Sequence, residues 1–309
     1  MTTVPLAVPV VPFDQVQGRI SRLWDPFELN PHFAVFGTTG SGKSHLIRHG
    51  ILPMRAYSRT VVIDVKDDRD SVWTGFGTPV TGLPPAFCRT GEGPARAQYR
   101  LIVDRANAQT QLRRFFDQIR NEGHCVIVVD ESREVTEREQ IGLGSVVENL
   151  ILTGRGIGIT LIMGAQSTAW AVSALKDQPA ALFIGQTRGT QQAKALSEIA
   201  GGGRELAATI GQIPARQWLY ADGWDGPGML ALTTPLDQNR ARGKGVMTNP
   251  PHDSLMPIRV YPSDTITARM PYPHERKTFN IESTPLLVVT HETGTQDIYD
   301  STKHVAVFA

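Results

Sequence analysis

Between residues 33 and 235, short apolar runs alternate with stretches in which apolar residues recur every three or four positions. Short apolar runs bounded by glycine or acidic residues are typical of parallel strands covered on both faces, and the intervening periodicity indicates helices. Six runs are predicted to be strands, at residues 33–37, 61–64, 100–103, 125–130, 160–164 and 181–185. The pattern therefore predicts an α/β fold, with a mostly parallel sheet and helices on both of its faces.

Two segments combine helical periodicity with a clear end signal. In the first, Gly123 follows an apolar face made by Leu112, Phe115, Phe116 and Ile119. In the second, Gly154 follows an apolar face made by Leu143, Val146, Val147, Leu150 and Ile151. Glycine is the residue that most readily ends a helix. Further helices are predicted around residues 191–200 and 205–210, and a hairpin pairing 217–221 with 229–233 would close the domain.

The segments flanking this pattern are rich in proline. Pro5, Pro9 and Pro12 disfavour both helix and central strand, so the opening segment from Met1 to Phe13 is predicted to be extended. The extended N-terminal arm as a whole is assigned to residues 1–30. The main α/β domain is predicted over residues 31–238. Seven prolines fall between Pro250 and Pro285. Residues 239–309 are therefore predicted to form a proline-rich tail or a small β-rich appendage.

Charge, cysteine content and hydropathy narrow the class of protein. The 309 residues carry a formal net charge of +1, which argues against a protein that wraps duplex DNA over its whole surface. Two cysteines, Cys88 and Cys125, are too few for a disulfide scaffold. No stretch approaches the roughly 18 apolar residues that span a bilayer, and the N-terminus lacks a secretion signal. We therefore expect a cytoplasmic protein, from a bacterial or archaeal cell or a virus-infected host.

A glycine-rich segment after the first predicted strand matches the phosphate-binding loop, or P-loop. Its eight residues are Gly37, Thr38, Thr39, Gly40, Ser41, Gly42, Lys43 and Ser44. The glycines allow backbone N–H groups to converge on phosphates at the start of a helix. Lys43 is expected to reach the β- and γ-phosphates and Ser44 to ligate Mg²⁺. The segment predicts that ATP and Mg²⁺ are bound.

The predicted strand 125–130 ends in two carboxylates, Asp130 and Glu131. At this position Asp130 can hold the magnesium shell, and Glu131 can polarise a water for attack on the γ-phosphate. Acidic residues also begin many ordinary loops. The catalytic interpretation is favoured because the pair follows the P-loop after a predicted crossover helix.

Arg155 and Gln166 lie at the two ends of the predicted strand 160–164. Gln166 would lie at the carboxyl edge of the sheet, where it could sense the γ-phosphate or orient the water; a plain polar loop is the alternative. Arg155 could offset the dipole of the preceding helix. It could instead act as an arginine finger donated to the nucleotide of a neighbouring subunit.

Taken together, these motifs resemble those of the FtsK/HerA superfamily of DNA-pumping ATPases, and the FtsK motor most of all. Pro31 and His32 precede the P-loop strand as in that family, and Ile63, Asp64, Val65 and Lys66 are similar to its Ile-Asp-Pro-Lys. The segment from Arg155 through Gly158 and Ile159 to Gln166 resembles its Arg-x-x-Gly-Ile and strand-end glutamine. Thr160 replaces the family's histidine, and Ser167 and Thr168 replace its Arg-Pro. The resemblance covers about residues 31–234.

The resemblance implies a RecA-like (ASCE) P-loop fold in which the Gln166 strand lies between the P-loop strand and the Asp130 strand. It also implies homo-oligomeric rings of five or six subunits, with double-stranded DNA in the channel and Arg155 reaching the adjacent subunit. A membrane anchor, a winged-helix tail and an N-terminal β-barrel are not evident in the sequence. We therefore expect a DNA translocase, in viral genome packaging or mobile-element transfer.

Two alternatives and the DNA contacts stay open. A secretion or conjugation ATPase would share the core motifs, and a nucleotide-gated assembly factor could use the C-terminal tail to dock a portal or another protein. Candidate DNA-contacting side chains fall into three groups. They are Arg113, Arg114 and Arg120; Arg133 and Arg138; and Arg240, Arg242 and Lys244. Such residues more often form a solvated surface, and for the third group a linker is the favoured interpretation.

Overall fold

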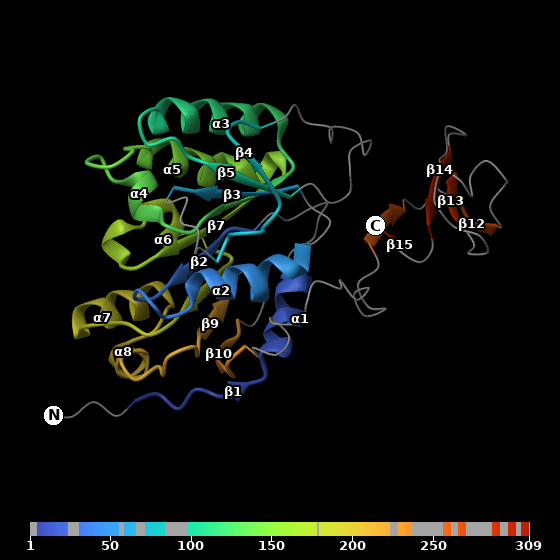
Figure 1. The fold of residues 1–309 in the computed structure, drawn as a ribbon. Coiled ribbons are helices and arrows are strands. Elements are labelled where there is room, and N and C mark those ends of the chain that lie inside the picture. The colour runs from blue at the N-terminus through green and yellow to red at the C-terminus, as the bar shows by residue number, and fades with distance from the viewer. Residues whose placement is uncertain are drawn as a thin grey trace. The chain divides into compact units, whose positions relative to one another are not determined.

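The protein is described by a computed structural model (Figure 1). The structure describes residues 5–23, 31–55, 59–65, 72–83, 98–177, 179–222 and 228–236, and five strands nearer the C-terminus. The chain divides into two compact units, Met1–Ala241 and Arg242–Ala309. Lys66, Cys88 and the basic group Arg240, Arg242 and Lys244 lie outside the described residues.

The first unit is built on a 10-stranded sheet, in the order β1-β10-β9-β8-β2-β7-β6-β3-β5-β4. The strands from β8 to β4 in this order run parallel to one another: β8 (Ala181–Ile184), β2 (Phe33–Phe36), β7 (Ile159–Ala165), β6 (Cys125–Val129), β3 (Thr60–Asp64), β5 (Gln98–Ile102) and β4 (Thr78–Val80). All six predicted strands are present. The predicted α/β fold with a mostly parallel sheet is confirmed.

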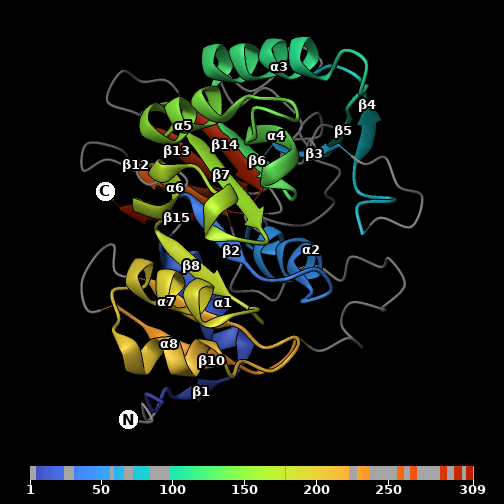
Figure 2. The ribbon, with the colours of Figure 1, turned by 90° about the vertical axis from the view of Figure 1, so that its left-hand side faces the viewer.

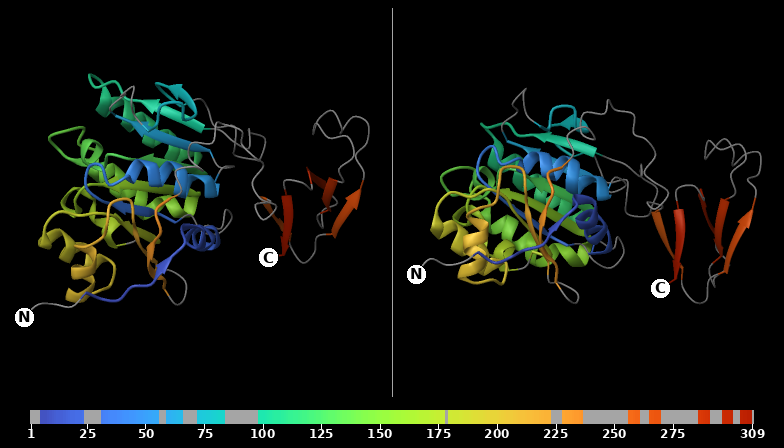
Figure 3. Two further views of the ribbon diagram at one scale, coloured as in Figure 1. Left: turned by 60° about the horizontal axis from the view of Figure 1, so that its bottom comes forward. Right: turned by 90° about the horizontal axis from the view of Figure 1, so that it is seen from below.

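The sheet is extended on one side by antiparallel pairing. β9 (Leu219–Asp222) pairs antiparallel with β8, and β10 (Leu230–Thr233) forms a hairpin with β9, as predicted. β1 (Val10–Val11) then pairs parallel with β10 at the edge of the sheet (Figure 3).

Helices cover both faces of the sheet. One face is covered by α3 (Ala108–Glu122), α5 (Gly144–Thr153), α6 (Ser173–Asp177), α7 (Thr190–Ile199) and α8 (Arg204–Ile210). The other is covered by α1 (Phe13–Leu23), α2 (Lys43–Leu46) and the π-helical turn Ile47–Ile51, which a 3₁₀ turn, Leu52–Arg55, follows. Figure 2 shows α5, α7 and α8 in front of the sheet and α1 behind it. A short helix, α4 (Ser132–Thr136), follows β6.

The alternation of side chains along β2 shows how the two layers are held. Ala34 and Phe36 belong to the apolar cluster that includes α3 and α5, whereas Phe33 and Val35 belong to the cluster that includes α1 and α2. Burial of a large apolar side chain such as Phe33, Val35 or Phe36 contributes about 1.5–3 kcal/mol. A strand that is buried on both faces fixes the P-loop, which follows it directly, against a rigid sheet.

The N-terminal segment differs from the predicted extended arm. Residues 5–12 are extended around β1, but Phe13–Leu23 forms the helix α1. Phe13, Val16 and Ile20 are spaced three and four residues apart, and all three are buried against the sheet. The prolines therefore prevent helix formation only as far as Pro12. After Pro12 the apolar periodicity favours a helix.

In the second unit, the described residues form five short strands. β11 (Met256–Val260) pairs parallel with β15 (His304–Phe308). β12 (Thr265–Arg269), β13 (Leu286–Thr290) and β14 (Gln296–Asp300) form an antiparallel sheet. Across the part of the chain that the structure describes, no helix is both long and apolar enough to cross a bilayer.

Candidate functional site

The strand order brings the predicted site residues to one edge of the sheet. β7 lies between β2 and β6, as the family resemblance implies. The P-loop, the Asp130–Glu131 pair and Gln166 follow the carboxyl ends of these three strands. Ligands of open parallel sheets bind at this edge.

The P-loop adopts the conformation that its glycines permit. Gly40 and Gly42 have φ values of 81° and 93°, in the left-handed region that side chains disfavour. α2 begins directly afterwards, at Lys43. The Lys43 ammonium donates hydrogen bonds to the carbonyl oxygens of Gly37, at 2.8 Å, and Thr38, at 3.1 Å. Lys43 is thus held within the loop that would surround a phosphate.

Asp130 has a different environment at each carboxylate oxygen. Its Oδ2 accepts a hydrogen bond of 2.8 Å from the indole N–H of Trp73, whereas its buried Oδ1 accepts none from the described residues. Burial raises the pKa of Asp130, and the Ser44 hydroxyl, the Trp73 indole and the Lys43 charge act against that rise. The Ser44 hydroxyl is close enough to the Asp130 carboxylate to act on its pKa, and a carboxylate and a hydroxyl are oxygen ligands that suit Mg²⁺. The residues present therefore fit the predicted metal.

Gly164 on β7 provides the space that Asp130 occupies. A Cβ atom at position 164 would lie 2.6 Å from the backbone oxygen of Asp130 and 3.2 Å from its Oδ1. The closer distance is to backbone, which cannot rotate away. The sequence places Gly164 in a strand, and only the pairing of β6 with β7 shows why glycine stands there.

We expect Gly164→Ala to destabilise the fold by about 1–3 kcal/mol and to weaken Mg-ATP binding, because Asp130 must move to admit the methyl group. Urea unfolding and nucleotide titration would measure the two effects. Gly18→Ala is the matched control, since a Cβ at that position in α1 meets nothing within 4 Å. A Gly164→Ala protein equal to the parent in both measurements would contradict this account of the site.

Glu131 and Gln166 are in direct contact. The Gln166 amide donates a 2.7 Å hydrogen bond to Glu131 Oε1, and the Thr39 hydroxyl donates one of 3.1 Å to Gln166 Oε1. Gln192, near the start of α7, donates a 2.7 Å hydrogen bond to the backbone oxygen of Gln166. The network joins the P-loop, β6, β7 and α7 at the position expected for the γ-phosphate.

Sequence reasoning did not find two residues that contact the site: Trp73, which donates to Asp130, and Gln192, which donates to the Gln166 backbone. Trp73 lies in a segment with no recognisable periodicity. Gln192 lies on a predicted helix, and the apolar pattern of that helix does not indicate what its polar residues do. Neither matches a motif. Their roles follow only from which loops meet at the carboxyl edge of the sheet.

Arg155 is not brought to this edge. It lies in the 3₁₀ turn Gly154–Ile157, before the first residue of β7, whereas Gln166 directly follows the last. Seven strand residues separate the two by about 20 Å. Burial lowers the pKa of Arg155 from its ordinary value. The side chain therefore lies too far away to act on a nucleotide bound at the P-loop of its own subunit.

His32 links the P-loop strand to its neighbours. Its Nδ1 accepts a 3.0 Å hydrogen bond from the Leu161 N–H on β7, so Nε2 carries the proton and donates to the Ile151 carbonyl of α5 at 2.9 Å. Burial lowers the pKa of His32 to about 4, against the effect of the Ile151 hydrogen bond and with a smaller contribution from Arg155. The imidazole is neutral at physiological pH.

We expect acidification from pH 6.5 to 4 to cost the fold about 3 kcal/mol through His32, because the unfolded state takes up the proton that the native imidazole resists. The loss appears as pH falls below the unfolded pKa and is complete below the folded one. Urea unfolding at several pH values would measure it. His32→Gln should flatten this pH dependence, whereas His124→Gln, at an exposed position, should leave it; equal slopes in both variants would refute the assignment.

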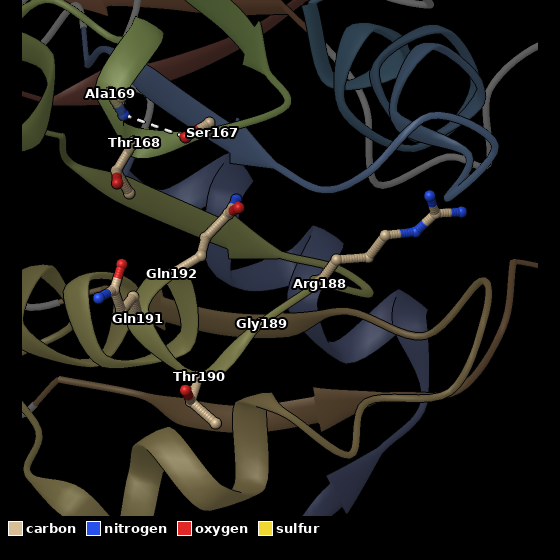
Figure 4. Close-up of a pocket in the computed structure, with 8 residues that line it drawn as sticks. All are labelled: Ser167, Thr168, Ala169, Arg188, Gly189, Thr190, Gln191 and Gln192. Atoms are coloured by element: carbon tan, nitrogen blue, oxygen red, sulfur yellow. Dashed lines mark hydrogen bonds between the residues drawn. The ribbon is translucent and has the colours of Figure 1, made fainter.

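Two pockets flank the network. One, of about 220 Å³, lies beside the P-loop and is lined by Gly40, Ser41, Gly42, His45, Arg216, Trp218 and Leu236. Arg216 has a φ of 67°, a strained conformation for a residue with a side chain. The other, of about 620 Å³, is lined by Ser167, Thr168, Ala169, Arg188, Gly189, Thr190, Gln191 and Gln192 (Figure 4). In Figure 4, Arg188 points away from Thr190 and Gln191.

The predicted basic residues on α3 and after β6 lie at exposed positions. Arg113, Arg114 and Arg120 are exposed on α3, and Arg120 donates a 3.0 Å hydrogen bond to Asn149. Arg133 pairs with Glu137 at 2.9 Å.

The chain matches no protein-family model and no curated protein sequence. Its fold is similar to that of B204, the DNA-packaging ATPase from Sulfolobus turreted icosahedral virus, at 19% identity and a TM-score of 0.52, over 68% of this chain and 100% of that one. The genome packaging NTPase B204 of Sulfolobus turreted icosahedral virus 2, in complex with ATP-gammaS, matches at 18% identity and a TM-score of 0.51, over 67% and 98% of the two chains. The comparisons thus show that this chain shares the fold of these packaging ATPases, in agreement with the predicted α/β fold with a mostly parallel sheet.

Proposed function

We propose that this protein is an ATPase that drives double-stranded DNA as one subunit of a ring, in viral genome packaging or a related transfer process. The observation that carries the proposal is the meeting of Lys43, Ser44, Asp130, Glu131 and Gln166 at one edge of the sheet. The similarity of the fold to a packaging ATPase supports the biological setting.

The residues of the site divide the chemistry of hydrolysis between them. Lys43 binds the β- and γ-phosphates in place of the loop carbonyls that it now contacts. Ser44 and Asp130 hold Mg²⁺, which neutralises phosphate charge when bound. Glu131 accepts the proton of the attacking water. The new bond from water oxygen to γ-phosphorus forms as the bond to the bridging oxygen breaks, and ADP leaves.

Gln166 controls whether Glu131 is available. Its amide now donates to the Glu131 carboxylate, which would otherwise accept the proton of the water. A γ-phosphate offers this amide a second acceptor. Gln166 is then able to turn toward the phosphate and release Glu131 for the water, so that hydrolysis depends on a triphosphate being present.

The small pocket beside the P-loop suits the rest of the nucleotide. It borders Gly40 and Gly42 and has an apolar side, made by Trp218 and Leu236, and a cation, Arg216. Its volume of about 220 Å³ is sufficient for a base. We assign the base to this pocket, and the C-terminal unit stays a predicted docking element for a portal or another protein.

The proposal is tested by measuring ATP hydrolysis with and without duplex DNA, together with displacement of a third strand annealed to that duplex. We expect stimulation by DNA that weakens as salt rises, because phosphate contacts release counterions. Lys43→Ala sets the background in both assays. ATP hydrolysis that duplex DNA leaves unchanged at every salt concentration would contradict translocation and leave the nucleotide site intact.

A further inference from the structure

Trp73 contacts the candidate metal ligand from a segment outside every motif. It lies between β3 and β4 and is 3% exposed. Its indole N–H donates to Asp130 Oδ2 at 2.8 Å. Its ring packs edge-on against Phe76, with centroids 5.6 Å apart. The indole therefore combines a buried apolar body with a hydrogen bond to a carboxylate.

The segment that carries Trp73 is also attached to the P-loop side of the site. Arg48 lies in the π-helical turn that continues α2, and it donates a 3.1 Å hydrogen bond to the Thr74 carbonyl. Its guanidinium lies 6.0 Å from the centre of the Phe76 ring. The segment that carries Trp73 thus contacts both the helical turn that continues from Lys43 and Ser44, through Arg48, and the Asp130 carboxylate, through Trp73.

The two oxygens of Asp130 are consequently separated in role. Oδ2 is occupied by the indole, and Oδ1 is buried without a hydrogen-bond partner among the described residues. An indole N–H only donates, so it binds one oxygen without competing for the metal. The bond restrains rotation of the carboxylate.

We propose that Trp73 is a positioning residue for Mg²⁺, holding Asp130 Oδ2 so that Oδ1 is presented beside the Ser44 hydroxyl. This inference deepens the proposed function and rests on its nucleotide site. It does not depend on DNA. Groups that orient a metal ligand from behind typically account for 10- to 100-fold in metal affinity.

The test replaces Trp73 in the full chain, by phenylalanine and by benzothienylalanine, in which sulfur takes the place of the indole N–H at nearly constant shape. A fluorescent ATP analogue is titrated at a series of Mg²⁺ concentrations and without metal. We expect the Mg²⁺ midpoint to rise roughly tenfold or more in both variants. Binding of the metal-free nucleotide should stay at the parent level, because Lys43 and the P-loop are unchanged.

Phe76→Leu is the matched control, because it disturbs the same packing without removing the hydrogen-bond donor. The Mg²⁺ midpoint of Phe76→Leu should remain within about twofold of the parent. If Trp73 had a purely structural role, Phe76→Leu would raise the midpoint as much as the Trp73 variants do. A benzothienylalanine variant with an unchanged midpoint overturns the proposal, and so does a parent protein whose nucleotide binding ignores Mg²⁺. If the parent protein binds Mg-ATP but DNA does not stimulate its ATP hydrolysis, translocation alone is refuted. The Mg²⁺ midpoints of the variants then still decide the role of Trp73.

Discussion

Replacing Arg155 with alanine is expected to lower ATP turnover by about 10³- to 10⁵-fold while leaving ATP binding unchanged, because an arginine finger acts only on transition-state charge. Arg155 lies at the opposite end of β7 from Gln166, so we propose that it serves the nucleotide of another subunit. Arg155→Lys should recover little, since the lysine ammonium lacks the planar fork of the guanidinium. Steady-state turnover and nucleotide titration would measure the two effects.

Mixed rings give this prediction its sharpest test. A Lys43→Ala subunit lacks a working nucleotide site but retains Arg155, and an Arg155→Ala subunit retains the site. Mixing the two inactive proteins should restore turnover wherever an intact site faces an intact arginine. Arg204→Ala, at an exposed position on α8, is the control for loss of a surface charge. Full turnover by Arg155→Ala alone, or no recovery in the mixture, would exclude a finger acting between subunits.

The second large effect is expected at Glu131. Glu131→Gln should reduce turnover by about 10²- to 10⁴-fold, because an amide cannot accept the proton of the attacking water. The glutamine keeps an oxygen where Glu131 Oε1 now accepts from Gln166, so the hydrogen-bonded network and the fold should persist. Turnover, ATP affinity and thermal midpoint together would separate lost chemistry from lost structure.

The same substitution at Glu134, which follows on α4, is the control for loss of one carboxylate near the site. Its turnover should match that of the parent. If Glu131→Gln hydrolyses ATP at the parent rate, Glu131 is not the base, and the water must be activated by another group. If it loses ATP binding as well, the residue holds the nucleotide rather than the water.

Local pattern was sufficient for much of the fold and for the core of the candidate site. Strands β2 and β6 are apolar runs that end at the P-loop and at Asp130, and a P-loop is contiguous in sequence. Such features depend on neighbours a few residues away, so a single sequence displays them. The N-terminal arm was misjudged for the opposite reason. The prediction rested on three prolines that precede Phe13, whereas the helix after them depends on burying Phe13, Val16 and Ile20 against the sheet.

The remaining features required the tertiary structure. The hydrogen bond from Trp73 to Asp130 joins residues 57 positions apart, and the space that Gly164 leaves for Asp130 exists only because β6 pairs with β7. The distance of Arg155 from Gln166 likewise follows from the strand between them. Strand order decides which loops meet, and it is set by packing over the whole sheet rather than by the residues at the site. The sequence by itself thus determined the P-loop pattern and the acidic strand end, and only the folded sheet decided which other side chains lie beside them.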